Sequence, residues 1–436
     1  MKRFLIGLLL TTILGSAAAY TPPQTLAEHP ELTIPGDRLY VGDKAQPRKA
    51  PKGYKPFYIS TFARHGSRFH VDTNFYHDFA EVMARADKLG LLTALGREAA
   101  AVVAEGARRH GTRVHDLSPI GYEQSRNIAH RTYKRFKPIF RKGTTIDGKS
   151  STYFRCIFTM AAFCQGLKEC EPTLEISQVA SYSMQDVVRP KYPPVLNRRR
   201  YLTAKEHRQR CLDVLDEWAA KQQCPTTMAR LVTDPERFTR EMGLSSYDFT
   251  CNLYRRLGFV HNFWKPQTEL IKRIFAPEDL HLYHKYYSHR WLSFYAEESN
   301  SDVMRYLSRL RYVVDDIAAN AEKAIEGRND AVAHLRFTHD SFLVPLLVLM
   351  QAEGCRGGTT TIDKGLDTWC ISENMCMAAN IQFVFFRNGQ GDILVQLLLN
   401  ESDIRLPIAS VDGFYRWDDL RRHLYKRLDT ADKAWM

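Results

Sequence analysis

The segment FYISTFARHGSRFH, residues 57–70, sets the framework for the rest of the chain. Its first half, residues 57–63, is a nearly continuous run of apolar and β-branched residues, which predicts a short strand covered on both faces. The run ends abruptly in Arg-His-Gly-Ser-Arg, residues 64–68, which we refer to as the RHGSR motif. In an open α/β sheet, ligands bind at the carboxyl ends of the strands. The motif therefore lies where such a sheet would bind a ligand.

The RHGSR motif has side chains suited to phosphoryl transfer. Arg64 and Arg68 offer forked donors whose geometry matches phosphate oxygens better than the point charge of a lysine does. His65, between them, can attack phosphorus as a neutral imidazole while the arginines hold the equatorial oxygens. We expect Gly66 to let a ligand approach the backbone closely. The alternative is an arginine-rich surface turn with a solvated histidine, and the motif alone leaves both interpretations open.

Residues 1–19 have the composition of a secretion signal. Lys2 and Arg3 precede an apolar run over residues 4–14, and small residues then end at Ala19 in an A-x-A pattern. The alternative is an N-terminal membrane anchor, but the apolar run is too short to span a bilayer. We therefore predict cleavage after Ala19 and a secreted or periplasmic protein with no integral membrane segment after signal removal.

The charge balance restricts the class of partner. The 436 residues include 61 Lys and Arg against 49 Asp and Glu, a net charge of +12, which becomes +10 without residues 1–19. This excess favours phosphorylated small molecules, nucleic acid or an anionic surface. Because the positive charge is not interleaved with aromatic residues that could stack on bases, we predict no nucleic-acid partner.

The nine cysteines are an odd number, so they cannot all pair within the chain. In an oxidising compartment, Cys211 with Cys224, and two of the three residues Cys355, Cys370 and Cys376, are plausible bridges. No Cys-x-x-Cys pair and no His/Cys spacing typical of zinc occurs. We therefore predict neither a metal nor another cofactor.

The composition along the chain predicts one α/β domain with an insertion. Residues 20–55, rich in Pro, Lys and Gly, predict an extended leader. Residues 56–170 and 331–436 carry the strand signals, and they predict two parts of an open, mostly parallel sheet flanked by helices. Residues 171–330 are charged and have helical periodicity, which predicts a mainly helical inserted domain or cap.

Two further predicted strands end in residues that could bind phosphate. STYFRC, residues 151–156, predicts a strand with Arg155 at its end, and AHLRF, residues 333–337, is followed by His339 and Asp340. Strand ends of an open α/β sheet meet at one edge, where helix N-termini add backbone amides for an anion. His339 could instead be a core histidine and Asp340 a helix N-cap. One shared site explains all three placements together.

These motifs resemble those of a known enzyme family. FARHGSR, LSPIGYEQ, STYFRCIFTMAAF and AHLRFTHDSFLVPLL are similar to the motifs of the histidine acid phosphatases, the phytase-containing branch of the histidine phosphatase superfamily. The chain looks most like the multiple inositol polyphosphate phosphatase group, and the resemblance covers the chain from about Pro56. It implies that His65 becomes a transient phosphohistidine and that Asp340 protonates the leaving alcohol. It also implies that phosphate is bound by Arg64, Arg68, Arg155 and His339.

Two positions bear on the subgroup. Many acid phosphatases of the family have proline where this chain has His70, which favours the inositol polyphosphate group. That group often carries His-Ala-Glu where this chain has His339, Asp340 and Ser341, the arrangement of the wider acid phosphatases.

The proposed roles also make demands that follow from chemistry alone. His65 must be neutral to attack, with one ring nitrogen fixed by a hydrogen bond, for which a backbone carbonyl is suited. A carboxylic acid beside a dianionic phosphate has a raised pKa, which suits Asp340 to general acid catalysis in mild acid. The arginines supply the charge that a metal ion supplies in a kinase.

The predicted function is hydrolysis of inositol polyphosphates, phytate included, to lower inositol phosphates and inorganic phosphate. Alternatives are a broad-specificity acid phosphatase for simple monoesters, a phosphomutase, which export disfavours, and a non-catalytic polyanion-binding protein, which would not need both a nucleophile and a proton donor. A polyphosphate substrate would gain attraction if basic side chains rim the pocket. The candidates are Lys134, Arg135, Lys137, Arg141, Lys142 and Arg198 to Arg200.

Overall fold

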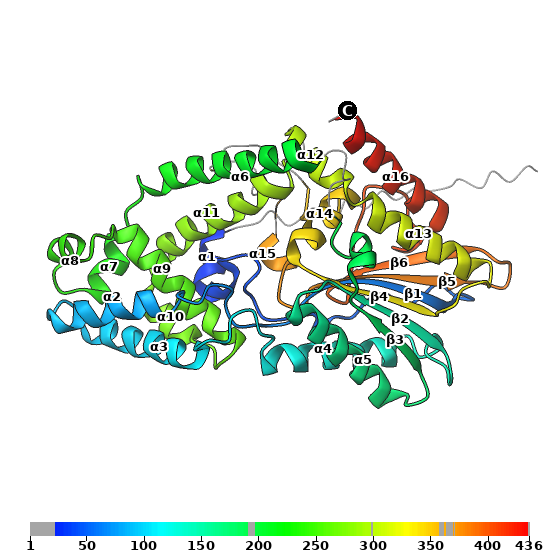
Figure 1. Cartoon of the computed structure of the whole chain (residues 1–436), viewed down its shortest axis with the longest axis horizontal. Coiled ribbons are helices and arrows are strands. Elements are labelled where there is room, and N and C mark those ends of the chain that lie inside the picture. Colours follow the sequence, from blue (N-terminus) through cyan, green and yellow to red (C-terminus); the bar gives the residue numbers. More distant parts are fainter. Residues whose placement is uncertain are drawn as a thin grey trace, which may run out of the picture.

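The computed structural model describes residues 22–190, 197–297, 300–356, 362, 369 and 371–434, so the predicted signal, residues 1–19, lies outside the described residues. A central sheet occupies one end of the elongated molecule and a lobe of helices the other (Figure 1). Within the described part of the chain, no helix combines the length and apolar character needed to cross a membrane.

The central sheet is mixed, with its parallel strands on one side. Its order is β3-β2-β4-β1-β5-β6-β7, and β8 pairs with β6. The contacts of β1 with β4, β4 with β2 and β2 with β3 are parallel, whereas β5 and β6 run antiparallel. The strands are β1 (Lys55–Arg64), β2 (Thr145–Ser150), β3 (Glu175–Val179), β4 (Ala333–Thr338), β5 (Asn380–Arg387), β6 (Ile393–Leu399), β7 (Ser402–Asp403) and β8 (Tyr415–Arg416).

Helices cover both faces of this sheet, as the apolar run of β1 requires. Alternate residues of a strand point to opposite faces. Ile59 and Ala63 pack in a core with α4 (Pro119–Arg135) and α5 (Phe154–Cys170). Tyr58 and Phe62 pack in a second core on the other face. That core contains α13 (Arg311–Ile325), α14 (Asp340–Met350) and α16 (Trp417–Lys433), which lie above the sheet in Figure 1. The predicted fold class is confirmed.

The helical lobe has its own core and uses segments from both sides of residue 171. The helices α2 (His77–Lys88) and α3 (Ala94–His110) share this core with helices from the later, helix-rich segment. Those are α7 (Pro225–Leu231), α9 (Ser246–Phe259), α10 (Thr268–Ile274) and α11 (Pro277–Tyr295). In contrast, β3 and α13, which also fall within residues 171–330, pack with the sheet. The remaining helices are α1 (Pro22–Glu28), α6 (Asn197–Ala219), α8 (Pro235–Met242), α12 (Ser301–Ser308) and α15 (Ile371–Asn374).

One predicted strand is wrong. Residues 151–156 do not form a strand, because β2 ends at Ser150 and α5 begins at Phe154. The true strand alternates buried and half-exposed residues and is polar, so it lacks the continuous apolar run on which the prediction relied. Arg155 therefore lies in the first turn of α5 rather than at a strand end.

The predicted Cys211–Cys224 disulfide is also wrong. Cys211 lies on α6 with its Sγ 3.6 Å from His207 Nε2, whereas the Tyr283 hydroxyl donates to Cys224 Sγ at 3.7 Å. Both thiols are free. Cys370 lies outside the described residues, so a bridge among Cys355, Cys370 and Cys376 stays a prediction.

Candidate active site

The two histidine motifs leave the sheet side by side. In the parallel register of β1 with β4, Arg64 lies beside Thr338, so the RHGSR motif and His339 follow neighbouring strands at the same edge. The His65 amide donates to the Thr338 carbonyl at 3.0 Å, which ties the two strand ends together. Arg155 approaches from the start of α5. The structure thus brings together His65, Arg64, Arg68, Arg155, His339 and Asp340.

His65 is held as a neutral imidazole. Its Nδ1 lies 2.9 Å from the Gly66 carbonyl oxygen. Because a carbonyl only accepts, Nδ1 carries the proton and Nε2 keeps its lone pair. Burial lowers the pKa of His65 well below 6.5, and the charges of Arg155, Arg64, Arg68 and His339 lower it further.

Arg64 is fixed by three acceptors. Its Nη1 donates to the carbonyls of Gly36 (2.5 Å) and Cys376 (2.9 Å), and its Nη2 donates to Asp340 Oδ2 at 2.6 Å. The side chain is almost fully buried, with 1% of its surface exposed. Its orientation is therefore set by the fold.

Arg155 sits between two histidines. Its Nη2 lies 3.2 Å from His339 Nδ1 and its Nη1 lies 3.2 Å from His115 Nδ1. Since a guanidinium only donates, both Nδ1 atoms accept, and His339 Nε2 is left to donate to Ser151 Oγ at 3.3 Å. Burial and the Arg155 charge lower the pKa of His339 to about 3. The sequence reasoning missed His115, which lies in a polar loop with φ of 66° and carries no periodic signal.

The arginines keep donors unused. The Nε atoms of Arg64, Arg68 and Arg155 are buried and have no acceptor among the described residues. Arg68 donates Nη1 to the Phe69 carbonyl at 3.0 Å, and burial lowers its pKa to about 10. Buried donors without partners are costly, and several of them converging at one place favour an anionic ligand.

Gly66 is required for packing. A Cβ at Gly66 would lie 2.7 Å from the Gly121 carbonyl oxygen, so α4 could not approach the motif. Ser118 caps this helix as predicted, because its Oγ accepts from the Gly121 amide at 3.2 Å. The Gly66 amide itself donates to Thr159 Oγ1 at 3.0 Å. The RHGSR motif therefore packs between α4 and α5.

Asp340 is the first residue of α14, and its carboxylate accepts from the Ser341 amide at 2.7 Å as well as from Arg64. Burial raises its pKa, but Arg64, His339 and Arg68 outweigh burial, so that the pKa of Asp340 lies below its usual value. The protein's own charges thus oppose the raised pKa that we expected. The charge of a bound phosphate would add to burial and act in the expected direction.

The family of the chain follows from a match over most of its length. A family model described as histidine phosphatase superfamily (branch 2) matches residues 59–400, which include all six residues of the site. The chain belongs to this superfamily. It is a histidine-type phosphatase, and the predicted resemblance is confirmed.

Comparison with solved structures gives the same fold. The multiple inositol polyphosphate phosphatase of Bifidobacterium longum, in complex with inositol hexasulfate, aligns with a TM-score of 0.68 at 15% identity, over 90% of this chain and 97% of that one. The phytase from D. castellii aligns with a TM-score of 0.63 at 13% identity, over 91% of this chain and 85% of that one. A search of curated protein sequences found no match.

Of the basic side chains predicted to rim the pocket of this phosphatase, Arg135 on α4 is engaged within the fold. Arg135 and Arg131 both bind the buried carboxylate of Glu401, at 3.1 and 2.8 Å, so they stabilise the fold. The side chains of Arg198 to Arg200 lie outside the described residues.

A different arginine borders the site. Arg189 lies with its Cζ 4.8 Å from the ring of Tyr153, and Arg155 contacts the same ring at 4.8 Å. The ring of Tyr153 meets that of His339 edge to face at 4.9 Å. Among the described residues, no carboxylate forms an ion pair with Arg189. This half-buried guanidinium is therefore available to a ligand at the site.

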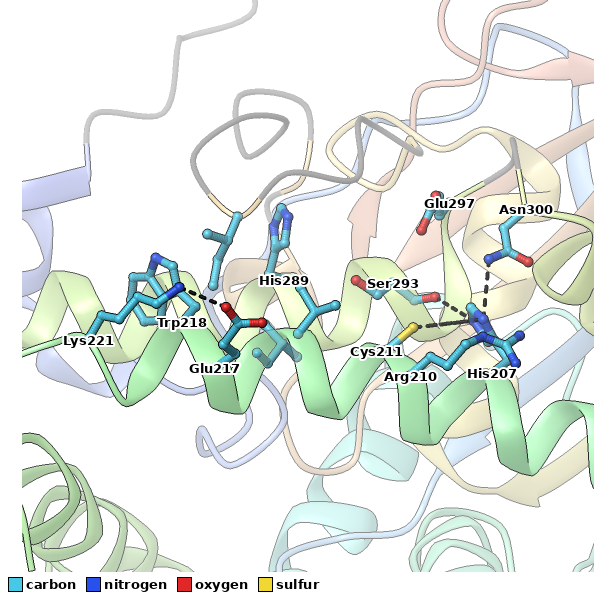
Figure 2. A pocket seen from close by; sticks show the side chains of 13 residues that line it. His207, Arg210, Cys211, Glu217, Trp218, Lys221, His289, Ser293, Glu297 and Asn300 are labelled. Atoms are coloured by element: carbon cyan, nitrogen blue, oxygen red, sulfur yellow. Dashed lines mark hydrogen bonds and ion pairs between the residues drawn. The ribbon is translucent and has the colours of Figure 1, made fainter.

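A separate cavity lies in the helical lobe. It has a volume of about 510 Å³ and lies between α6 and α11, with His207, Trp218 and His289 in its wall (Figure 2). None of the six site residues lines it. The described residues contain no group of three or more His, Cys, Asp and Glu side chains that could hold a metal ion.

Proposed function

We propose that this chain is an exported phosphomonoesterase that forms a phosphohistidine on His65 and hydrolyses inositol polyphosphates, phytate included, to lower inositol phosphates and inorganic phosphate. The observation that carries the proposal is the state of His65. Its Nδ1 is tied to a backbone carbonyl, and three arginines lower its pKa. A neutral Nε2 surrounded by guanidinium groups is a nucleophile next to a phosphate-binding site.

In the first half-reaction, His65 Nε2 forms a bond to phosphorus as the bond to the leaving oxygen breaks. Asp340 gives its proton to that oxygen, so the product leaves as an alcohol. An arriving phosphate competes with Asp340 for Arg64 and places negative charge beside the carboxyl group. Both effects raise the pKa of Asp340 and load it with the proton that the step needs.

In the second half-reaction, the Asp340 carboxylate takes a proton from a water molecule as the water attacks phosphorus. The bond from phosphorus to Nε2 breaks, and inorganic phosphate and neutral His65 are regenerated. Arg64, Arg68 and Arg155 hold the equatorial oxygens in both steps, and they stabilise charge as it redistributes. His339 accepts from Arg155 and so orients the guanidinium that holds these oxygens, and its own Nε2 proton reaches them by leaving Ser151 Oγ.

The preference for polyphosphates is supported by Arg189 and by the related structures. Arg189 lies one aromatic ring away from His339 and has no carboxylate partner among the described residues, so it can bind a second phosphate of the same substrate. Two of the similar solved structures are named as a multiple inositol polyphosphate phosphatase and a phytase. Export is supported by the signal-like composition of residues 1–19.

The exposed rings of α5 favour a second candidate, a broad-specificity phosphatase for simple monoesters. Phe154 and Phe158 are 69% and 44% exposed, and both lie on α5 close to Arg155. Their spacing places them on one face of the helix. An apolar surface beside the site suits an aryl or alkyl leaving group better than a polyphosphate.

The two candidates are separated by Arg189→Ala. If Arg189 binds a second phosphate, the KM for inositol hexakisphosphate should rise by roughly tenfold or more, and that for p-nitrophenyl phosphate should change less than about twofold. Higher salt should raise the KM for the polyphosphate steeply and that for the monoester slightly, because surface attraction is screened. Arg422→Ala, an exposed arginine of α16 paired with Asp419, is the matched control. Parallel responses of both substrates would favour the monoester phosphatase.

A further inference from the structure

The leader contributes a turn to the wall of the site. We define the leader turn as residues 36–38. The Gly36 amide donates to the Met375 carbonyl at 3.1 Å, and the Met377 amide donates to the Arg38 carbonyl at 2.8 Å. The Gly36 carbonyl accepts from Arg64. Gly36 has a φ of 90°, which side chains rarely adopt, so the turn has a defined shape next to a phosphate-binding arginine.

The same turn is tied to the helical lobe. The Asp37 carbonyl accepts from His261 Nε2 at 2.7 Å and from Asn262 Nδ2 at 2.9 Å. Asn262 Oδ1 in turn accepts from the hydroxyl of Ser67, inside the RHGSR motif, at 2.9 Å. The backbone of Asp37 is therefore fixed relative to both parts of the molecule.

The carboxylate of Asp37 lies half-buried in a positive environment without a direct partner. Among the described residues, no donor lies within hydrogen-bond or ion-pair distance of its oxygens. Asp37 lines a small cavity of about 10 Å³ together with Arg255 and Phe259, and the guanidinium of Arg68 lies 5.4 Å from the same Phe259 ring. Of the two carboxylates that act on Arg68, Asp37 acts more strongly than Asp340.

We propose that Asp37 is a positioning residue of the phosphate site, whose carboxylate opposes the charge of Arg68 from the side of the helical lobe and so limits how tightly the site holds phosphate. The inference rests on the proposed role of Arg68 as a phosphate ligand. Three arginines and a buried histidine would otherwise bind the product, inorganic phosphate, more tightly. A fixed negative charge behind Arg68 favours release of the product.

The effect of Asp37 on phosphate binding should depend on pH. Burial raises the pKa of Asp37, and Arg68, Arg64, Arg255 and His261 lower it, with burial prevailing. As the pH falls, the carboxylate takes up a proton and its opposition to Arg68 is lost. The charged or titratable groups that face Asp37 are Arg64, Arg68, Arg255, His261, Glu31, Tyr76 and Tyr254.

The test is calorimetric titration of the full chain with inorganic phosphate across a range of pH. At neutral pH, Asp37→Asn should bind phosphate roughly 3- to 10-fold more tightly than the wild type, because a like charge is removed. The ratio should approach one as the pH falls. The KM for p-nitrophenyl phosphate should fall in parallel without a rise in kcat. Asp37→Glu keeps the charge and should restore the wild-type affinity.

Glu31→Gln is the matched control, because it removes one negative charge from the same cavity at a residue whose carboxylate faces His29, at 3.2 Å. Asp37→Ala provides a second removal of the charge if Asp37→Asn does not fold. Equal or weaker phosphate binding in a folded charge-removed variant at every pH overturns the inference. If the wild type binds phosphate but hydrolyses no ester, the proposed function fails and the effect of Asp37 remains measurable. If it hydrolyses esters and Asp37→Asn has no effect, the inference alone fails.

Discussion

Arg64 at the end of β1 and Arg336 within β4 are buried guanidinium groups on neighbouring parallel strands, and each is paired with one carboxylate. Arg336 donates Nε to Asp316 Oδ2 at 2.7 Å, Nη2 to the same oxygen, and Nη1 to Ser60 Oγ at 2.8 Å. All three of its nitrogen atoms are engaged. Lys149 lies 3.8 Å from Asp316 and 3.0 Å from Asp147, so two cations face two carboxylates and the charges are balanced locally.

Arg64 has a different environment. Its Nε has no acceptor among the described residues. Its carboxylate partner, Asp340, belongs to a site that also contains Arg68 and Arg155. Neither of these two arginines forms an ion pair with a carboxylate of the described chain. The comparison teaches that burial of an arginine is not itself a sign of function. The site is distinguished by positive charge and donors that the protein does not balance, which a phosphate can.

The largest effect should come from the nucleophile. We expect His65→Ala to lower kcat for p-nitrophenyl phosphate by roughly 10⁴-fold or more, with little change in the thermal unfolding midpoint. The matched histidine of the other region is His334, which is buried on β4 with its Nδ1 2.9 Å from the Tyr58 hydroxyl. His334→Ala should lower the unfolding midpoint and leave kcat of the folded protein within a few-fold. Substantial turnover by His65→Ala would contradict the assignment of His65 as the nucleophile.

The next effect should depend on the leaving group. Asp340→Asn should slow hydrolysis of alkyl phosphates by roughly 10²–10⁴-fold, the usual contribution of general acid catalysis. The loss in kcat/KM for p-nitrophenyl phosphate should be far smaller, because this parameter reports only the first half-reaction and the leaving group needs little protonation. The ratio of the two kcat/KM values measures the role of Asp340 as proton donor. Equal losses on both substrates would make Asp340 a residue that positions Arg64 instead.

The strands β1 and β4 and the edge where they end are predictable from the sequence, because apolar runs mark buried strands and parallel strand ends meet at one edge. The strands β2 and β3 are not predictable in this way, because neither is a continuous apolar run. The roles of Asp37 and His115 are not predictable, because both lie in non-periodic segments that reach the site through long-range folding. Arg135 differs for another reason. Its charge is evident in the sequence, but its pairing with the buried Glu401, 266 residues further along the chain, is not. Charge is a local property, and its placement depends on the whole fold.

The smallest effect on catalysis should come from the balanced pair. Asp316→Asn leaves Arg336 buried without its partner, so we expect a loss of roughly 3–5 kcal/mol in the free energy of unfolding at neutral pH, with kcat of the folded protein unchanged. Burial raises the pKa of Asp316, but Arg336 and Lys149 outweigh burial and hold it below 3.8. The pair therefore stabilises the wild type above that value, and its contribution is lost as the pH falls through the lowered pKa.

Denaturant unfolding of the wild type and of Asp316→Asn at several pH values measures how much the Asp316–Arg336 pair contributes to the free energy of unfolding. The difference in free energy of unfolding between the two proteins should narrow in strong acid. A difference that stays constant with pH would show that the substitution acts through packing and not through the charge pair.

The account depends most directly on where phosphate is bound covalently during turnover. Asp340→Asn, in which breakdown of the intermediate should be slow, can be mixed with a phosphate-labelled ester, quenched rapidly in base and digested for mass spectrometry. The account predicts label on His65 that is stable in base and lost in acid. Label on a serine, or steady turnover with no labelled histidine at any quench time, would contradict it.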